Sequence, residues 1–380
     1  MDEVAIGLAQ RLIRCPSVTP EDKGALDVLE AELDGLGFHC RRLPFAAPGT
    51  APVDNLFATF GVTGRHLLFA GHSDVVPVGN RQEWTTDPFG GVIEAGQLYG
   101  RGAADMKGAI ACFVAAAGAV LGDLQSGRLS LLITGDEEGP AVNGTAPCMA
   151  MLAAEGIRFD FCLVGEPTNP MRLGEMIKIG RRGSANARLT MRGIQGHSAY
   201  PHLARNAAHD LINLCSRLLE LKLDEGTDHF EPSNLQITAL ETASNATNII
   251  PGEASALANI RFNDRHKAHT LEELIRREIA AQGGHCTLQF SASGEAFLTA
   301  PNAEIDLLRD AVVRCTGLTP VYSTSGGTSD ARFIKNYCPV AEFGLVGQTM
   351  HKIDEHVAIA DLVQLTEIYR AFLTDFFERP

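Results

Sequence analysis

The feature that most constrains the fold is a series of short apolar runs that each lead into glycine or a turn and then into an acidic or imidazole side chain. The clearest is LLFAGHSDVVPVG, residues 67–79, in which the apolar run ends at Gly71 and is followed by His72 and Asp74. Side chains two residues apart on an extended strand emerge on the same face, so His72 and Asp74 can point together beyond the strand's tip. In open α/β sheets this edge is where ligands bind.

Apolar runs and helical patterns alternate through the first half of the chain. This alternation predicts an α/β fold with a largely parallel sheet that is covered by helices on both faces. We expect strands at about 54–60, 66–71, 129–135 and 161–165, and helices at about 2–14, 21–36 and 107–121.

After residue 180 the pattern changes to the order β-α-β-β-α-β, which is typical of a ferredoxin-like α+β domain. We expect its strands at 184–193, 234–242, 253–263 and 285–293, and its helices at about 203–222 and 270–282. From about residue 296 the first pattern resumes, with helices at about 302–315 and 361–377 and a strand at 339–343. The sequence therefore predicts one domain of residues 1–180 and 296–380, interrupted by a second domain of residues 181–295. Closure about the junctions near 180 and 295 is expected.

The charge and the cysteines restrict the partners and the compartment. A formal net charge of −14 without a Lys or Arg cluster disfavours nucleic acid and anionic membranes as partners. The nine cysteines form no CxxC pair and predict reduced thiols. The N-terminal segment lacks a basic region and a cleavage site, and we expect no apolar run to reach membrane-spanning length. We therefore expect a cytoplasmic protein with no nucleic-acid or membrane partner.

Four further segments place polar side chains at the ends of apolar runs or in glycine-flanked turns. A single such residue is usually a helix cap, a turn residue or a solvated side chain. Together, two histidines and three or four carboxylates at one sheet edge would concentrate like charge unless cations neutralised it. The sequence therefore predicts a metal site. The segments are YGRGAADMKG with Asp105, LLITGDEEG with Glu137 and Glu138, FCLVGEPT with Glu166, and VGQTMHKIDEH with His351.

Imidazole and carboxylate ligands without cysteine suit zinc, with cobalt or manganese as substitutes. A pair of ions bridged by one carboxylate suits hydrolysis of an amide or ester. Glu137 is then free to act as a base, and Asp74 can orient His72 by accepting a ring hydrogen bond. A solvated acidic turn is the alternative interpretation of Glu137 and Glu138. The predicted ligands are His72, Asp105, Glu138, Glu166 and His351.

The motifs GHSDVVP, GRGAADMKG, TGDEEG and GEPT resemble, in order and separation, those of the M20 family of dinuclear zinc aminoacylases and carboxypeptidases. The resemblance covers essentially the whole chain. It implies two zinc ions per subunit with Asp105 as the bridging ligand, Glu137 as general acid and base, and Asp74 in support. It also implies that the inserted domain is a lid and dimerisation domain. His197, in GIQGHSAYPH, would then stabilise the oxyanion in the partner's active site of a homodimer.

The substrate class also follows from the resemblance. The segments IKIGRRGS, NIIPGEASALANIRFN and STSGGTSDARF are similar to a branch of the family that acts on an N-succinyl amino acid, more than to the branch that acts on acetylornithine. Arginine suits carboxylate binding because its planar fork binds bidentately, although a surface ion pair is the alternative for each arginine. The implied substrate contacts are Arg181, Tyr200, Asn248, Arg261, Gly327 and Thr328.

Three alternatives stay open on sequence alone. The chain could hydrolyse acetylornithine or another N-acyl amino acid with the same ions, it could cut dipeptides, or it could be a non-catalytic homologue that binds metal. Other hydrolase and nucleotide-binding classes are disfavoured, because the chain has no HExxH, GxSxG, Walker or GxGxxG motif.

Overall fold

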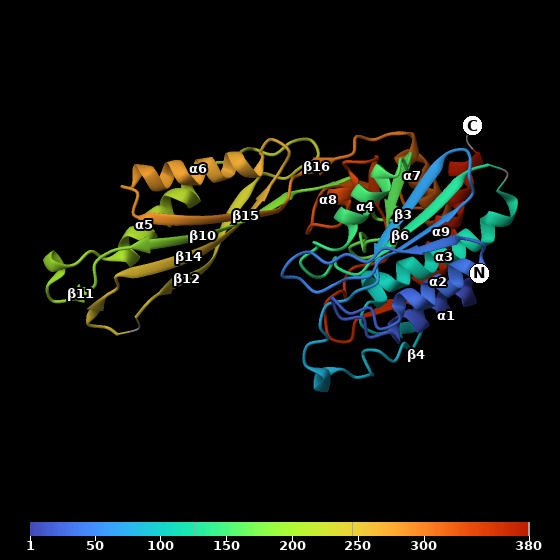
Figure 1. Ribbon diagram of the computed structural model, residues 1–380, viewed down its shortest axis with the longest axis horizontal. Helices are drawn as coiled ribbons and strands as arrows, with labels where there is room; N and C mark the ends of the chain where they lie inside the picture. The colour runs from blue at the N-terminus through green and yellow to red at the C-terminus, as the bar shows by residue number, and fades with distance from the viewer. Residues whose placement is uncertain (125, 245, 379–380) are drawn as a thin grey trace. The chain divides into compact units, whose positions relative to one another are not determined.

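The computed structural model describes residues 1–124, 126–244 and 246–378, which form two compact units (Figure 1). The first unit comprises the described residues of Met1–Ile179, Thr299–Ser323 and Ser329–Pro380. The second unit comprises those of Gly180–Leu298 together with Thr324–Thr328.

The first unit is built on an eight-stranded sheet in the order β1-β2-β6-β3-β7-β18-β8-β17. Its centre is parallel, because β3 pairs in parallel with both β6 and β7, and β7 pairs in parallel with β18. The pairs β1–β2, β2–β6 and β18–β8 are antiparallel, so the sheet is mixed toward its edges. The strands are β1 (His39–Arg42), β2 (Leu56–Phe60), β3 (His66–His72), β6 (Arg128–Thr134), β7 (Phe161–Val164), β8 (Met176–Lys178), β17 (Val321–Ser323) and β18 (Val340–Glu342).

Helices cover this sheet: α1, α3 and α9 pack against one another, α7 packs against α9, and α4 packs against α8. Apolar strands buried on both faces are what a parallel sheet between helices requires, and β3 and β6 are buried over nearly their whole length. The prediction of an α/β unit with a mainly parallel sheet is therefore confirmed. The helices are α1 (Asp2–Ile13), α2 (Ala25–Gly35), α3 (Gly108–Val120), α4 (Thr145–Ala154), α7 (Ala303–Thr316), α8 (Ala331–Ile334) and α9 (Ile359–Glu378).

A second, three-stranded sheet in this unit joins two distant segments of the chain. It contains β4 (Val92–Glu94), β5 (Gln97–Tyr99) and β19 (His356–Ala358). In its register His356 lies opposite Tyr99. The segment that follows His351 is therefore paired with the segment that precedes Asp105.

One helical stretch, Ala103–Val120, is long and apolar enough to cross a membrane by length and composition, contrary to the expectation that no apolar run reaches that length. Within the protein, 83% of this stretch is buried, so it serves as a core helix packed against α1 and α9. All nine cysteines have free thiols.

The second unit has a four-stranded antiparallel sheet in the order β12-β14-β10-β15, with helices α5 and α6 packed on it. The predicted order β-α-β-β-α-β is confirmed. Its core side chains occupy every second position of the central strands, with alanines at one end of each strand and larger apolar residues at the other. Its elements are β10 (Gly183–Arg192), α5 (Ala207–Glu220), β12 (Asn234–Thr242), β14 (Glu253–Phe262), α6 (Ala268–Ala281) and β15 (Cys286–Gly294), with the short pairs β9 (Gly180–Arg181) with β16 (Phe297–Leu298) and β11 (Gly196–His197) with β13 (Ile249–Ile250).

The five residues Thr324–Thr328, here called the strap, belong to the second unit although the chain on both sides belongs to the first. The Thr324 hydroxyl donates to the His229 carbonyl oxygen at 2.5 Å, and the Arg181 guanidinium donates to the Gly327 carbonyl oxygen at 3.1 Å. The chain therefore passes between the units at four points. The sequence reading placed only two junctions, because five small polar residues carry no periodic signal.

Candidate metal centre

The carboxyl ends of three neighbouring parallel strands bring the first polar side chains together. His72 is the last residue of β3, Glu137 and Glu138 follow β6, and Glu166 follows β7. In the sheet register His72 lies opposite Thr134 on β6, so the strands end at the same level. The apolar pattern that buries the strands thus also sets the level at which their polar ends meet.

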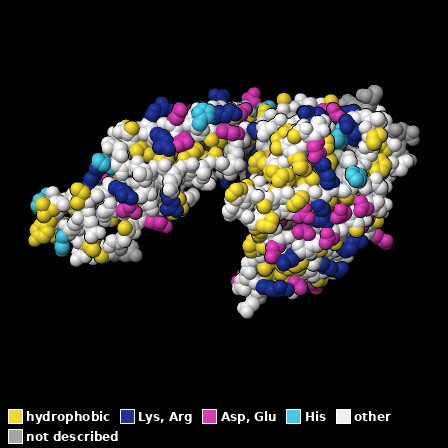
Figure 2. All heavy atoms as spheres, in the orientation of Figure 1, with side chains coloured by type: hydrophobic (Ala, Val, Ile, Leu, Met, Phe, Trp, Pro, Cys, Tyr) yellow, Lys and Arg dark blue, Asp and Glu magenta, His cyan; other side chains and the backbone are white. Residues whose placement is uncertain are grey.

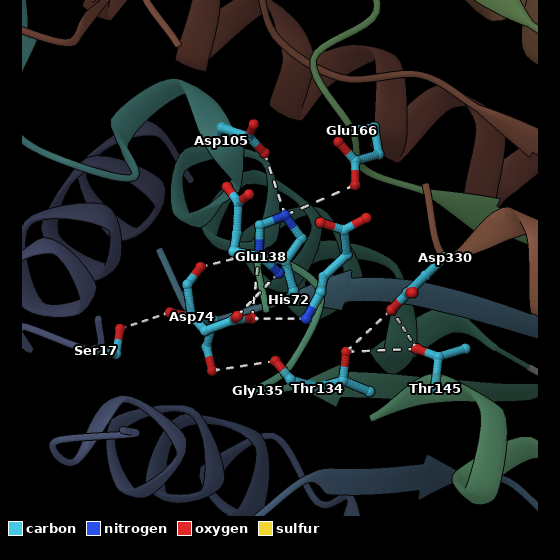
Figure 3. A network of polar contacts seen from close by, with 12 residues as sticks. Ser17, His72, Asp74, Asp105, Thr134, Gly135, Glu138, Thr145, Glu166 and Asp330 are labelled. Carbon is cyan, nitrogen blue, oxygen red and sulfur yellow. Dashed lines mark hydrogen bonds and ion pairs between the residues drawn. The ribbon is translucent and has the colours of Figure 1, made fainter. Parts of the chain in front are cut away.

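Asp105 lies between the two histidines that the sequence singled out. One of its carboxylate oxygens, Oδ1, is 3.2 Å from His72 Nε2, and the other, Oδ2, is 3.2 Å from His351 Nε2. Figure 3 shows the Asp105 carboxylate pointing at the His72 ring. A carboxylate that offers one oxygen to each of two imidazoles has the arrangement that a bridging metal ligand needs.

Each histidine also faces a second carboxylate. Glu166 Oε1 is 3.7 Å from His72 Nε2, and Glu138 Oε1 is 2.9 Å from His351 Nε2. Two groups of possible ligands have their donor atoms within 4.8 Å of one another, namely His72 with Asp105 and Glu138, and His72 with Glu137 and Glu166. Proximity alone therefore does not separate Glu137 from the other carboxylates.

The protonation of this cluster reflects a large excess of negative charge. Burial would lower the pKa of His72, but the carboxylates of Asp105 and Asp74 raise it well above its usual value. Hydrogen bonds to Asp105 and Glu138 raise the pKa of His351 to about 10. Burial and the nearby Asp105 raise the pKa of Glu166 well above its usual value. Protons thus hold positions that divalent cations could take, and the donor set of imidazole nitrogens and carboxylate oxygens suits such cations.

Asp74 supports this cluster mainly through the main chain. Its carboxylate accepts the backbone N–H groups of Glu137 at 3.3 Å and Glu138 at 3.1 Å. The His72 ring nitrogen Nδ1 lies 2.9 Å from the Asp74 carbonyl oxygen and 3.6 Å from its carboxylate. The expected ring contact to the carboxylate is therefore the longer of the two. Asp74 fixes the turn that carries both glutamates (Figure 3).

Two glycines in the quoted motifs have a packing reason. A Cβ atom at Gly71 would lie 2.6 Å from the end of the Met106 side chain, and one at Gly165 would lie 2.7 Å from it. Met106 follows Asp105 and is fully buried. One side chain thus packs against the residues that precede His72 and Glu166, which holds three parts of the cluster in register.

The sequence reading missed the residues that surround Glu137. Arg332 Nη1 is 3.8 Å from Glu137 Oε1, and buried Asp330 accepts the Thr145 hydroxyl at 2.6 Å. Burial and the nearby Asp330 raise the pKa of Glu137 to about 8. Both residues lie in STSGGTSDARF, a segment interpreted only for Gly327 and Thr328, and its Asp-x-Arg spacing was the available signal.

The comparison with family models decides the classification. Residues 68–375 match the model of peptidase family M20/M25/M40. The chain belongs to the M20 family. It is 57% identical, over 98% of its own length and 97% of the relative's, to the succinyl-diaminopimelate desuccinylase of Rhodospirillum centenum.

Solved M20 structures show the same fold at low identity. A metallo-carboxypeptidase from Sulfolobus solfataricus has a TM-score of 0.82 and is 18% identical, with 98% of this chain and 99% of that one covered. A dinuclear metal-binding peptidase from Bacillus subtilis has a TM-score of 0.72 and is 15% identical, with 100% and 99% covered. At these identities the likeness concerns the fold alone.

The residues that the M20 resemblance implied for the second unit fall into two groups. His197, Tyr200 and Asn248 form the first: the His197 and Tyr200 rings are 5.7 Å apart, and the Ser198 N–H donates to the Asn248 carbonyl oxygen at 3.0 Å. All three side chains are exposed. Among the described residues, the His197 ring makes one local hydrogen bond, which it accepts from the Ala199 N–H at 3.0 Å.

Arg181, Arg261 and Gly327 form the other group, with half-buried Thr328 beside Gly327. Arg181 is buried and bonds to the Gly327 carbonyl, and Arg261 lies opposite Ser184 near the start of β10. His197 and Tyr200 follow the C-terminal end of β10, and Asn248 directly precedes β13, which pairs with β11. Ten residues of β-strand span about 33 Å, so the second unit of this M20 chain does not present both groups to one small molecule.

Proposed function

We propose that this chain is a succinyl-diaminopimelate desuccinylase, which hydrolyses N-succinyl-LL-2,6-diaminopimelate to succinate and LL-2,6-diaminopimelate in diaminopimelate and lysine biosynthesis. The identity of 57% to a relative of that name supports the substrate. The single observation that carries the chemistry is Asp105 between His72 and His351, each of which faces a further carboxylate. Free thiols on all nine cysteines are compatible with the cytoplasm, which we propose as its location.

The contacts suggest how two zinc ions would be held. His72 and Glu166 would bind one ion, His351 and Glu138 would bind the other, and Asp105 would bridge them. Nitrogen and oxygen ligands without thiolate are compatible with zinc, and cobalt or manganese could substitute. Such a pair of ions supplies Lewis-acid polarisation of a carbonyl group and acidifies a water molecule.

Glu137 is the residue we assign to proton transfer. Its side chain is 13% exposed beside the cluster, and Arg332 Nη1 lies 3.8 Å from its Oε1. Without bound cations, burial and the nearby Asp330 raise its pKa to about 8. The positive charge of bound zinc would lower this pKa, toward that of a base that takes a proton at neutral pH. Glu137 would accept a proton from the attacking water and return it to the departing amine nitrogen. His197 of a second copy would donate a hydrogen bond to the oxyanion that develops on the amide carbon's oxygen.

A homodimer would explain the two separated groups in the second unit. The group of His197, Tyr200 and Asn248 would then serve the catalytic centre of the partner, and Arg181, Arg261, Gly327 and Thr328 would serve another centre. Exposed apolar side chains at that unit support such an assembly, and Figure 2 shows hydrophobic atoms gathered at the end where β11 lies. The exposed apolar side chains of the second unit include Ile194 (61% exposed), Leu203 (70%), Ile212 (55%) and Leu240 (58%).

The substrate assignment is tested by assaying one zinc-loaded sample on succinyl-diaminopimelate, acetylornithine and a dipeptide, with metal content measured on the same sample. We expect two zinc ions per chain and turnover of the succinyl compound far above the others. Preferred turnover of acetylornithine or of the dipeptide would instead place the chain with a different M20 activity. Two bound ions without any amidase activity would indicate a non-catalytic homologue.

Replacement of Glu137 tests the assignment of the base. Glu137→Gln removes the proton acceptor but keeps the shape of the side chain, so we expect kcat to fall about 10²–10⁴-fold while zinc content is unchanged. Glu94→Gln, on the exposed strand β4, is the control and should keep full activity. A fully active Glu137→Gln variant would contradict the assignment.

A further inference from the structure

We propose that Glu355, held by Arg101, is a positioning residue that sets the distance between Asp105 and His351 and thereby controls binding of one of the two metal ions. The proposal rests on the dinuclear centre proposed above. Arg101 lies in the segment YGRGAADMKG and Glu355 in the segment VGQTMHKIDEH, and neither residue is among the predicted ligands or catalytic groups.

Glu355 and Arg101 form a fully buried ion pair. Arg101 Nη1 is 2.7 Å from Glu355 Oε2, and the two side chains are 2% and 0% exposed. The guanidinium also donates to the carbonyl oxygens of Lys352 at 3.1 Å and Pro77 at 3.2 Å, and it lies over the Trp84 ring. A buried pair of this kind persists only when its remaining donors and acceptors are satisfied, and here most of them are.

The second oxygen of Glu355 holds the turn that carries Asp105. Glu355 Oε1 accepts the backbone N–H of Ala104 at 2.9 Å and that of Asp105 at 3.2 Å. This turn, Ala103–Lys107, has non-helical backbone angles at Asp105, so it lacks the regular hydrogen bonds that would otherwise orient the carboxylate. Glu355 supplies the acceptor in their place.

Glu355 also lies four residues after His351, on a loop that main-chain contacts hold as well: the Thr85 N–H donates to the Asp354 carboxylate at 2.8 Å, and the Gly100 N–H donates to the Glu355 carbonyl oxygen at 2.8 Å. His351 has a left-handed backbone with φ of +62°, and its side chain is 46% exposed. The loop is closed by the Thr349 hydroxyl, which donates to the His356 carbonyl oxygen at 2.6 Å. The contact of Glu355 with the Asp105 turn therefore ties one loop-borne ligand directly to the bridging ligand.

The ligands His72 and Glu166 are positioned without a contact to Glu355. His72 is the last residue of a central strand, and Glu166 lies two residues after the end of its parallel neighbour, so the sheet itself holds both. Both ions share Asp105, but only the second also depends on the His351 loop. Loss of the Glu355 contact should therefore weaken the ion bound by His351 and Glu138 much more than the ion bound by His72 and Glu166.

The test is zinc titration of the full-length protein against a competing chelator, which yields the two dissociation constants separately. Glu355→Gln keeps the side chain's shape and an acceptor for the amide N–H groups but removes the charge that pairs with Arg101. Arg101→Lys keeps the positive charge but cannot reach all the acceptors of the planar guanidinium. For both variants we expect one dissociation constant to rise about 10- to 100-fold and the other, which depends on Glu355 only through the shared Asp105, to rise much less.

Two further variants make the result specific. Glu304→Gln removes a half-buried ion pair with Arg65 in the same unit, and should leave both constants unchanged. In a His351→Ala background, which should bind a single ion, adding Glu355→Gln should raise the remaining constant by much less than 10-fold. A 10- to 100-fold rise in that background would overturn the proposal.

The outcomes separate this proposal from the proposed function. A wild-type protein that binds fewer than two zinc ions would contradict the dinuclear centre itself. A wild-type protein that binds two, with Glu355→Gln retaining both wild-type constants or losing both equally, would overturn the positioning role alone.

Discussion

The two units place their functional candidates in opposite ways. In the first unit His72 and His351, far apart in sequence, both lie 3.2 Å from one carboxylate. In the second unit Arg261 lies opposite Ser184 near the start of β10, whereas His197 follows the end of that strand. The cause is strand direction: parallel strands all end at one edge of a sheet, whereas neighbouring antiparallel strands end at opposite edges.

Burial follows the same division. The candidate ligands on the sheet, such as His72 and Glu166, are buried at 1% and 8% exposure, whereas Tyr200 of the second unit is 56% exposed. A parallel sheet can thus complete a metal centre within one chain. An antiparallel sheet of this size offers two separate surfaces, and we propose that one of them serves a second copy of the chain.

The strongest test of this comparison is His197→Ala. If the second unit works in trans, kcat should fall about 10²–10³-fold because an oxyanion donor is lost, while zinc content stays at the wild-type level. Mixing this variant with Glu137→Gln should restore activity, since the mixed dimer would contain one centre with both residues intact. No recovery on mixing, despite exchange of subunits, would contradict the role in trans.

A weaker effect is expected from Leu240→Glu. This side chain lies on β12, the edge strand of its sheet, next to Ile212 in an apolar hollow of about 360 Å³. Loss of one buried leucine at a dimer interface, worth roughly 1.5–3 kcal/mol, should weaken the dimer about 10- to 100-fold. Sedimentation and activity measured on dilution would show it, with unchanged zinc content. Val62→Glu, at an 87% exposed position of the first unit, should leave the assembly unaffected.

The smallest effect concerns acid stability, which should also differ between the units. Burial lowers the pKa of His66, in the first unit, from 6.5 to about 4, and its ring nitrogens lie 2.8 Å from the Arg158 carbonyl oxygen and the Ser130 hydroxyl. As the pH falls, His66 therefore takes up its proton at a higher pH in the unfolded chain than in the folded one. This contribution to stability is present above pH 6.5 and is lost as the pH falls toward 4, by at most about 1.4 kcal/mol per pH unit.

Asp224, in the second unit, titrates lower. Burial would raise its pKa, but hydrogen bonds from Ser233, Gly226 and Asn263 lower it from 3.8 to about 2. Its contribution is present above pH 3.8 and lost as the pH falls toward 2. Chemical denaturation at several pH values should therefore show a shallower slope between pH 6.5 and 4 for His66→Gln, and below pH 4 for Asp224→Asn. Slopes parallel to wild type in both variants would contradict this division.

The parts of the molecule that the sequence predicted are those with a periodic or chemical signal. The central strands and the inserted β-α-β-β-α-β order followed from apolar periodicity, and the acids and histidines at strand ends followed from their chemistry. Three-residue strands such as β8 and β17 carry too few residues for a period to appear. The buried pair of Arg101 and Glu355 joins positions 254 residues apart, and only the folded chain brings such positions together.

Because the strap Thr324–Thr328 belongs to the second unit, that unit is not formed by one continuous segment of the chain. A chimera that exchanged only Gly180–Leu298 for the corresponding piece of a relative would leave these five residues behind, and the incoming arginine at position 181 would have to find its carbonyl partner on a foreign loop. Recombination between relatives is therefore expected to give a folded protein only when Gly180–Leu298 and the strap come from the same parent. Evolution should conserve the match between these two segments.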